Sequence, residues 1–336
     1  MKSLLYIGNQ LSKHGYNKTS IETLGVFLEV EGYNVEFTSD KKNQWYRMLD
    51  MVWVTLLKVR KVDFILIDTY STSSFWYAVV CSQIARVFKV KYVPILRGGD
   101  LPNRLKNNPK LCRMVFANAY QNVAPSAYLK QAFESAGFTN VIHIPNSIEI
   151  DKYGFKSREK ITPKLLWVRA FASIYNPEMA VKVLQQLQEK HPSASLTMVG
   201  PDKDGSLQTT KAFAKSIGVA VNFTGQLSKE DWWQLASEHD VFINTTHFDN
   251  TPISVMEAMA LGLPVVSTDV GGIPYLLTDK ENALLVPDNE DKTMTEAILD
   301  LLNDEIKANQ LSKNARIFIE QMDWQVVKQS WISLLK

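Results

Sequence analysis

Two carboxylates, Asp249 and Glu257, flank the start of one predicted helix, and their spacing suits an extended ligand with a sugar at each end. Pro252 is expected to open this helix, because proline has its φ preset for a first turn and its missing N–H costs nothing there. Eight residues of helix span roughly 12 Å along the axis. Acidic side chains accept hydrogen bonds from ribose hydroxyls in dinucleotide-binding folds. We therefore expect Glu257 to hold a ribose and Asp249 to hold a second sugar.

The stretch around this helix, residues 240–277, predicts a strand, loop, helix, strand, glycine turn and second helix. DVFIN (240–244) and VVST (265–268) are short apolar runs of the kind found in buried parallel strands. Pro274 is expected to open the second helix. Both helices then begin at the carboxyl ends of strands, which is the edge of an open parallel sheet where ligands bind. Free N–H groups and the helix dipole favour an anion such as phosphate there.

The chain of 336 residues is long enough for two domains, and strands alternate with helices throughout. Apolar runs predict strands at 3–7, 34–37, 63–67, 91–95, 120–123, 141–144, 164–168, 195–200, 221–225, 240–244, 265–268 and 283–286. In the first half, helices are predicted at 18–31, 44–60, 74–88, 103–117 and 126–136. This pattern is typical of an α/β protein with doubly wound parallel sheets. Neither G-x-G-x-x-G nor G-x-x-x-x-G-K occurs, which disfavours a nicotinamide dehydrogenase and a P-loop enzyme.

DNTPISVMEAMALGLPVVSTDVGG (249–272) resembles the signature of the family 4 (group 1) retaining glycosyltransferases of the GT-B fold. That family has an acidic residue, seven intervening residues, Glu, and then Ala-Met-Ala-x-Gly-x-Pro-Val-Val. The first acidic residue is usually Glu, and this chain has the shorter Asp249. The alternative is a plain α/β domain without this site. In such a domain Gly262 and Pro264 would only end a helix, and Glu257 would be a solvated residue. This alternative accounts for each residue singly, but not for the occurrence of all of them at the spacing of the signature.

The resemblance implies two Rossmann-like doubly wound domains that face a central cleft. Residues 1–150 would form the acceptor-side domain and residues 151–321 the nucleotide-sugar donor domain. A final helix at 322–336 would pack back on the first domain.

The resemblance also implies which residues form the site. Arg169 matches an arginine that holds the donor diphosphate, although on its own it could form only a surface ion pair. The family's lysine six residues on is absent, and Tyr175 stands in its place. The catalytic residues would be Asp249 and Arg169. The donor-binding residues would be Glu257, Asn250, Thr251, Pro252, Ile253, Ser254, Gly225, Gln226, Leu227 and Gly200. The acceptor or phosphate side would comprise Gly15, Arg97, Gly98 and Gly99.

Arg97 has two interpretations. It could bind phosphate or an anionic acceptor, and it is one candidate to replace the missing lysine. Alternatively, an ion pair between Arg97 and Asp100 would only stabilise the turn at Gly98–Gly99. The family often carries a histidine in this loop, and this chain has none. The loop at residues 8–17 is glycine-rich in the family, whereas here it has only Gly8 and Gly15.

The implied reaction moves a sugar from a nucleoside-diphosphate sugar, with UDP or GDP, to an acceptor hydroxyl with retention. The acceptor would be a glycan or lipid-linked molecule in cell-surface polysaccharide or glycolipid synthesis. Arg169 and the N–H groups of Ile253 and Ser254 would stabilise the departing phosphate, so we expect no metal and no cofactor. Two alternatives stay open. One is a sugar-nucleotide-binding protein without turnover, suggested by the missing lysine and by Asp249. The other is a GT-B epimerase or phosphorylase.

The location and partners follow from charge and hydropathy. The sequence has no long apolar span and no signal peptide, so we expect a cytoplasmic protein, at or near the inner face of the membrane. Residues 1–150 carry 18 Lys and Arg against 11 Asp and Glu, while residues 151–336 carry 19 against 24. The basic first half could face a membrane surface or a lipid-phosphate acceptor. No basic cluster with interleaved aromatic residues predicts nucleic-acid binding.

Residues 44–61 predict an amphipathic helix with two possible roles. Its apolar stripe is Trp45, Leu49, Val52, Leu56 and Val59, and basic residues close the helix. The stripe could lie in a membrane interface. It could instead be the core face of a helix whose basic last turn suits its dipole, and the sequence favours this second role.

Overall fold

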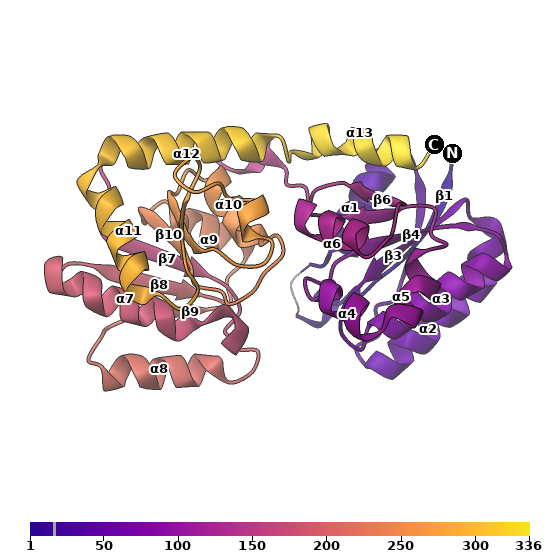
Figure 1. Cartoon of the computed structure of the whole chain (residues 1–336), viewed down its shortest axis with the longest axis horizontal. Coiled ribbons are helices and arrows are strands. Elements are labelled where there is room, and N and C mark those ends of the chain that lie inside the picture. Colours follow the sequence, from indigo (N-terminus) through magenta and orange to yellow (C-terminus); the bar gives the residue numbers. More distant parts are fainter. Residues whose placement is uncertain (16–17) are drawn as a thin grey trace. The chain divides into compact units, whose positions relative to one another are not determined.

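A computed structural model describes residues 1–15 and 18–336, which divide into two compact units (Figure 1). Unit 1 comprises Met1–Pro145 and Ser333–Lys336, and unit 2 comprises Asn146–Ile332. Tyr16 and Asn17, which end the predicted loop at 8–17, lie outside the described residues. The twelve predicted strands are all present, with ends shifted by at most two residues.

Unit 1 is built on a six-stranded parallel sheet in the order β2-β1-β3-β4-β5-β6. Its strands are β1 (Ser3–Ile7), β2 (Asn34–Thr38), β3 (Phe64–Thr69), β4 (Lys91–Leu96), β5 (Asn122–Ala124) and β6 (Val141–His143). Its helices are α1 (Ser20–Val30), α2 (Gln44–Lys58), α3 (Phe75–Val87), α4 (Leu101–Asn107), α5 (Pro109–Phe116) and α6 (Ala127–Ser135). The strand order reverses between β1 and β3, so the carboxyl ends of these strands mark the switch point.

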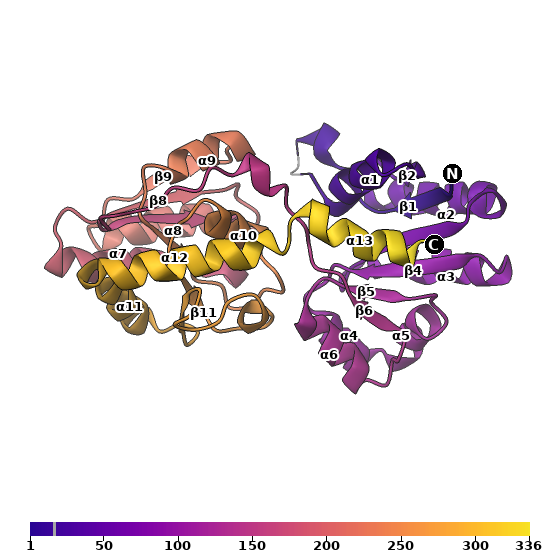
Figure 2. The same ribbon diagram turned by 90° about the horizontal axis from the view of Figure 1, so that it is seen from above.

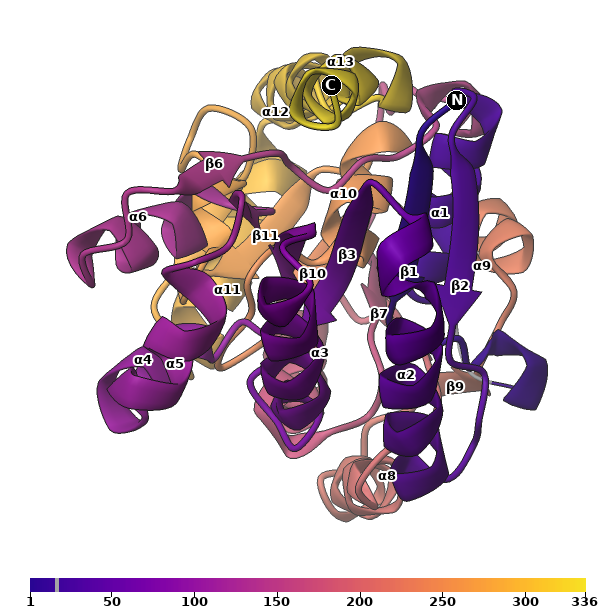
Figure 3. The ribbon, with the colours of Figure 1, turned by 90° about the vertical axis from the view of Figure 1, so that its right-hand side faces the viewer.

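The core of unit 1 follows from the burial of its central strands. All six residues of β3 are buried, because a central parallel strand is covered on both faces. Helices α2 and α3 lie side by side (Figure 3) and pack against Leu5, Ile7, Ile65 and Ile67. Helix α1 packs along β1 and β2.

The predicted helix at 103–117 is wrong, because two helices, α4 and α5, meet there at Asn108. Pro109 has no N–H to continue a helix, and its ring disfavours the α conformation in the preceding residue. Asn108 accordingly has φ −132° and ψ 54°. Pro109 then becomes the first residue of α5, a position that proline favours.

The predicted core role for the stripe on α2 is wrong for three of its members. Trp45, Leu49 and Leu56 are exposed, while Val59 is buried. The helix packs on unit 1 through a different ladder of residues four apart, which is Arg47, Met51, Thr55 and Val59. Arg47 and Thr55 of the buried ladder are polar, so helical periodicity of the apolar residues pointed to the other side of the helix.

Unit 2 contains a second six-stranded parallel sheet, in the order β12-β11-β10-β7-β8-β9. Its strands are β7 (Lys164–Val168), β8 (Ser195–Val199), β9 (Asn222–Gly225), β10 (Val241–Asn244), β11 (Val265–Thr268) and β12 (Leu284–Val286). Its helices are α7 (Pro177–Lys190), α8 (Ser206–Ser216), α9 (Lys229–Ala236), α10 (Ile253–Ala260), α11 (Asp291–Asn303) and α12 (Glu305–Glu320). This is the Rossmann strand order, and it reverses between β7 and β10.

Helices cover both faces of this second sheet. Leu165 and Trp167 point into a core shared with α7, α8 and α11, whereas Leu166 between them points into a core shared with α9, α10 and α12. The alternation follows from the two-residue period of a strand. Figure 1 shows α7 next to α8, and Figure 2 shows α12 running beside α10.

The remaining elements are short, apart from the last helix. The 3₁₀ helices are η1 (Ser12–His14), η2 (Val59–Lys61), η3 (Ile150–Lys152), η4 (Ser173–Tyr175) and η5 (Ile273–Tyr275). Helix α13 (Trp324–Leu334), predicted at 322–336, contains the boundary between Ile332 of unit 2 and Ser333 of unit 1. Within the described ranges, we find no helix with the length and apolar character needed to cross a bilayer.

The free energy of unfolding is expected to fall as the pH drops below 6.5, in part because of His239 in unit 2. The buried ring has Nδ1 2.8 Å from the Leu235 carbonyl oxygen and Nε2 2.9 Å from Thr197 Oγ1. Burial lowers the pKa of His239 below its ordinary value of 6.5, so the folded state favours the neutral ring. This stability is fully present above pH 6.5 and is lost as the pH falls towards the lower pKa of the folded state.

Urea unfolding at a series of pH values measures this slope. His239→Gln should flatten it below pH 6.5. His14→Gln, which changes a solvent-exposed ring in unit 1, is the control variant. Parallel curves for the wild type and His239→Gln would show that other groups control the acid response.

Candidate functional site

The candidate site lies at the switch point of the sheet in unit 2. Strands β7 and β10 are neighbours, with Leu166 paired to Phe242, so both strands end at the same edge. Arg169 follows β7 directly, and the loop of residues 245–252 follows β10. The crevice outside the carboxyl ends of strands at such a reversal is where open α/β sheets bind ligands.

The two predicted catalytic residues form an ion pair at this edge. Arg169 and Asp249 are in contact, and both side chains are largely buried. The Arg169 guanidinium also lies over the ring of Tyr175, 4.3 Å from its centroid. Burial lowers the pKa of Arg169, and interaction with Tyr175 opposes that change. The alternative of a surface ion pair for Arg169 is therefore wrong. Tyr175, which stands at the sequence position of the missing lysine, stacks on the remaining cation.

The segment around Tyr175 holds the loop that carries Asp249. Thr245 Oγ1 donates to the carbonyl oxygens of Tyr175 and Asn176, at 2.9 Å each. The Trp167 indole N–H donates to the same Thr245 oxygen at 3.0 Å. Two residues on, the His247 N–H donates to the Ile174 carbonyl at 2.8 Å. These bonds fix the start of the loop, and nothing in the sequence pattern had singled out Thr245.

Two glycines hold the other side of the same loop. The Gly272 N–H donates to the Asp249 carbonyl at 2.8 Å. A Cβ at Gly272 would lie 2.1 Å from the Asn250 oxygen, and one at Gly271 would lie 2.4 Å from the Asp249 oxygen. Any side chain at either glycine would therefore displace the Asp249 loop. The double glycine, which the sequence placed as a turn, supports the site by allowing this close approach.

The helix predicted to open at Pro274 is wrong, because the turn there is only η5 (Ile273–Tyr275). The chain ends this turn at two buried leucines, Leu276 and Leu277. The Asn282 side chain then accepts a bond from the Thr278 N–H at 2.8 Å, which turns the backbone away from a helix. Of the two helix starts predicted in this region, only that of α10 is therefore present.

The start of α10 has the features of an anion site. Pro252 is its N-cap and has no side-chain cap bond to the described helix, so the N–H groups of Ile253 and Ser254 lie at an uncapped N-terminus. Ser254 Oγ and Arg169 Nε are both buried without a hydrogen-bond partner among the described residues. Buried polar atoms are nearly always satisfied, so a ligand with anionic oxygens would account for both.

Glu257 lies inside α10 and is only 3% exposed, so its predicted alternative as a solvated residue is wrong. Its Oε1 accepts from the Tyr153 hydroxyl at 2.9 Å and lies 2.7 Å from Lys229 Nζ. Burial, followed by the charge of Glu257, raises the pKa of Tyr153, so the phenol stays a donor. The Tyr153 ring packs on Trp233 with centroids 4.4 Å apart. Sequence reasoning missed Tyr153 and Lys229, because their contact with Glu257 depends on tertiary packing.

The other predicted donor residues lie near this edge but differ in role. Gly200 follows β8, and a Cβ there would lie 1.8 Å from the Arg169 carbonyl oxygen, so this glycine packs against the arginine's backbone. Its N–H donates to the Gly225 carbonyl at 2.8 Å. Gln226 and Leu227 follow Gly225 into α9, and Leu227 packs on the core shared by α9, α10 and α12. Asn250 and Thr251 complete the loop before Pro252.

The predicted acceptor-side residues belong to unit 1. Arg97 follows β4 and pairs with Asp68 of the neighbouring strand at 3.2 Å, so the alternative of an Arg97–Asp100 pair is wrong. The Tyr6 hydroxyl donates to the same Asp68 oxygen at 3.1 Å. Burial raises the pKa of Asp68, and Arg97 opposes that change. The buried pairing explains why Arg97 turns inward instead of towards the turn.

The glycines of unit 1 lie on two loops. Gly98 and Gly99 follow Arg97, and a Cβ at Gly98 would lie 2.4 Å from the Ser71 nitrogen. Gly15 ends η1 with φ 82° and has open space around its Cβ position. Gly98 and Gly99 are next to Arg97 in the sequence, on the loop after β4, whereas Gly15 lies on the loop after β1. β3 lies between β1 and β4 in the sheet.

The described residues do not cluster into a metal centre. They contain no group of three or more His, Cys, Asp or Glu side chains that could hold a metal ion. Cys81 and Cys112 are free thiols in buried positions.

Comparisons with known proteins give the following matches. The family model described as "Glycosyl transferases group 1" matches residues 149–318, slightly more than half of the chain. Spore coat protein SA of Bacillus subtilis (strain 168) is 26% identical over 198 residues, which cover 54% of this chain and 52% of that protein. The chain thus spans about half the length of the relatives that it matches by sequence.

Two solved structures resemble the whole chain. Anabaena Alr3699/HepE, solved in complex with UDP, has a TM-score of 0.78 at 18% identity, with 100% of this chain and 99% of that chain covered. Sucrose-phosphate synthase from Thermosynechococcus elongatus has a TM-score of 0.81 at 15% identity, with 99% and 98% covered. Together with the two six-stranded parallel sheets, these likenesses confirm the predicted GT-B fold class.

Proposed function

The chain belongs to the glycosyl transferases of group 1, and from that premise we propose that it transfers a sugar from a nucleoside-diphosphate sugar to an acceptor hydroxyl with retention. The observation that carries this proposal is the Arg169–Asp249 pair at the switch point of unit 2, beside buried polar atoms that lack partners among the described residues. Membership of family 4 within group 1 stays a prediction.

The proposed reaction needs no covalent intermediate on the protein. The acceptor oxygen forms a bond to the anomeric carbon, and the bond from that carbon to the diphosphate breaks on the same face. The departing phosphate oxygen takes the acceptor's proton. Arg169 and the N–H groups of Ile253 and Ser254 stabilise the negative charge that grows on the phosphate. Asp249 orients the transferred sugar. Since fixed cations and N–H groups supply the charge, we propose that transfer proceeds without a metal ion or cofactor.

The donor in this proposal is a UDP-sugar, with a GDP-sugar as the second candidate. The support for UDP is the fold shared with Alr3699/HepE, which was solved with UDP and with UDP-glucose. Glu257 would accept hydrogen bonds from the ribose, and the backbone of Gly225, Gln226 and Leu227 would contact the base. The proposed acceptor is a glycan or a lipid-linked molecule in cell-surface polysaccharide or glycolipid synthesis, used at the cytoplasmic face of the membrane.

A sugar-nucleotide-binding protein without turnover is the second candidate. The observation in its favour is that Tyr175 stacks on Arg169 where a second cation would otherwise stand. The two candidates differ in one outcome. The enzyme would release UDP from a UDP-sugar when an acceptor is present, whereas the binding protein would retain the sugar nucleotide intact.

UDP is expected to stabilise the protein against heat, and Glu257→Gln should remove about half of that effect or more. Ligand at a hundredfold excess over its Kd adds about 2.7 kcal/mol, or about 5–10 °C for a unit of this size. Losing charged hydrogen bonds to a ribose costs about 1.5–3 kcal/mol, which is an affinity loss of about 10–150-fold. A thermal-shift titration with UDP, GDP and their sugars measures both quantities.

Glu238→Gln is the matched control, because that carboxylate is exposed on the same unit. It should bind as the wild type does. If no nucleotide shifts the wild-type midpoint, the donor-site assignment fails. If Glu257→Gln binds UDP as tightly as the control does, the ribose role of Glu257 is wrong.

A further inference from the structure

Helix α2 carries an apolar face that the core of unit 1 does not use. Six large side chains on it are exposed: Trp45, Tyr46, Leu49, Trp53, Leu56 and Leu57. Trp45 is 76% exposed and Trp53 is 62% exposed. Trp45, Leu49, Trp53 and Leu57 lie four residues apart, so they share one side of the helix. This side is opposite the buried ladder that includes Met51 and Thr55, so burial against unit 1 does not explain it.

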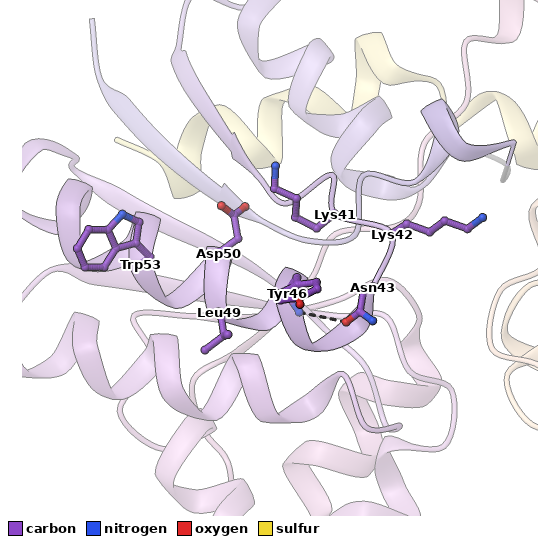
Figure 4. A pocket seen from close by; sticks show the side chains of 7 residues that line it. All are labelled: Lys41, Lys42, Asn43, Tyr46, Leu49, Asp50 and Trp53. Carbon is purple, nitrogen blue, oxygen red and sulfur yellow. Dashed lines mark hydrogen bonds between the residues drawn. The ribbon is translucent and has the colours of Figure 1, made fainter.

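The face is concave at its N-terminal end. Figure 4 shows the residues that line this hollow, which are Lys41, Lys42, Asn43, Tyr46, Leu49, Asp50 and Trp53. Asn43 caps the helix by accepting from the N–H groups of Trp45 and Tyr46, so the first turn holds both aromatic side chains outward. The two lysines lie at one end of the hollow, and Trp53 lies at the other.

Basic residues frame the apolar face at both ends. Lys41 and Lys42 precede α2, and Arg60 and Lys61 follow it. Residues 41–61 contain six Lys and Arg and one acidic residue, Asp50, but Arg47 is buried and Lys58 pairs with Glu36, so the four residues at the two ends supply the basic charge. Asp50 lies beside the face and accepts from the Thr38 hydroxyl at 3.3 Å. A partner that covers the face must therefore offer apolar area in the middle and negative charge around it.

A bilayer with anionic headgroups has this chemistry. Tryptophan and tyrosine favour the headgroup region of membranes, because the apolar part of the side chain can face the lipid while its N–H or O–H group contacts water. One or two Lys or Arg residues near an anionic membrane surface raise the affinity for that membrane about tenfold. A second copy of the chain fits less well, since pairing α2 with its own copy would bring the basic ends together and cost like-charge repulsion.

We propose that α2 is a membrane-binding helix, which lies in the plane of an anionic bilayer with Trp45, Leu49 and Trp53 in the headgroup region. The proposal names α2 as the surface of unit 1 that contacts the membrane. It rests on the proposed function, because membrane binding would bring unit 1 to a lipid-linked acceptor. Binding to lipid itself requires neither donor nor acceptor. It can therefore be tested separately from sugar transfer.

The test is co-sedimentation of the full chain with vesicles, without any sugar nucleotide. Vesicles of phosphatidylcholine alone are compared with vesicles of phosphatidylcholine and phosphatidylglycerol in equal parts. The wild type should bind the anionic vesicles, and binding should weaken as salt rises. Trp45→Ser with Trp53→Ser should weaken binding more than tenfold. Lys41→Gln with Lys42→Gln should weaken it about thirtyfold.

Ile306→Ser with Ile317→Ser is the matched control, because these α12 side chains are 85% and 62% exposed in unit 2. It should bind vesicles as the wild type does. Circular dichroism and thermal unfolding check that each variant folds. The proposal fails if the wild type does not bind anionic vesicles, or if the tryptophan and control variants bind equally well. It also fails if light scattering finds a wild-type dimer that the tryptophan variant abolishes, since a second copy would then cover the face. None of these results would change UDP binding.

Discussion

Arg169→Ala is expected to slow sugar transfer by about 10²–10³-fold in kcat, the usual cost of removing one preorganised donor from a charge-stabilising site. The guanidinium lies at the switch point of unit 2 in contact with Asp249, and one of its nitrogens has no partner among the described residues. Its charge would matter most when the phosphate departs. The KM for UDP-glucose should therefore change less than kcat. Release of UDP from UDP-glucose with an acceptor, followed over time, measures both constants.

Two further variants make this result specific. Arg169→Lys keeps a cation but loses the planar fork and the stacking on Tyr175, so it should recover only part of the rate. Arg113→Ala removes an exposed arginine of α5 and should keep the wild-type rate. Thermal unfolding of each variant separates loss of chemistry from loss of fold. A folded Arg169→Ala enzyme with a wild-type kcat would refute the proposed charge stabilisation.

Arg158→Ala is expected to reduce the free energy of unfolding by about 3–5 kcal/mol. Arg158 is 4% exposed in unit 2, 3.6 Å from Asp240, and burial lowers its pKa to about 10. Its guanidinium donates to five backbone carbonyls, those of Lys156, Ala236, His239, Leu261 and Gly262. Three of these belong to the ends of α9 and α10, so the variant would remove the buried charged donor that links the two helix ends and would leave Asp240 without its cation. Urea unfolding measures the change.

Arg316→Ala provides a graded comparison within the same unit. That guanidinium donates to two carbonyls, of Tyr153 and Ala260, and is more exposed, so it should cost less than Arg158→Ala. Lys190→Ala, at the exposed end of α7, should change stability by less than about 0.5 kcal/mol. If Arg158→Ala proved no worse than Lys190→Ala, the carbonyl contacts would not contribute to stability.

The sequence was most informative where local pattern alone determines structure. Parallel strands such as β3 and β7 are continuous apolar runs, and their positions could be predicted to within two residues. The pairing of Asp249 with a helix start was predictable for the same reason, since proline, glycine and periodicity are local signals. The break at Pro109 was available in the sequence and was missed.

Contacts made through tertiary packing were beyond such reasoning. Glu257 contacts Tyr153 and Lys229, which lie far from it in the sequence of unit 2. Arg97 forms an ion pair with Asp68 and not with Asp100, which is closer in the sequence. Neither set of contacts can be predicted from the spacing of the residues. The same limit applies to α2, where the ladder that contains Arg47 and Thr55 faces the core, although the apolar pattern pointed to the other side of the helix.

The assignment of Ser333–Lys336 to unit 1 has a consequence for biosynthesis. Residues 1–145 leave the ribosome first, and the last four residues of unit 1 follow only after the 187 residues of unit 2. Leu334 and Leu335 are both buried in the folded chain. Unit 1 therefore cannot complete its native contacts until unit 2 has been synthesised, and the contacts that complete it join segments far apart in the sequence, a slow kind of contact to form. A nascent unit 1 with apolar surface still uncovered is where we expect molecular chaperones to act on this protein.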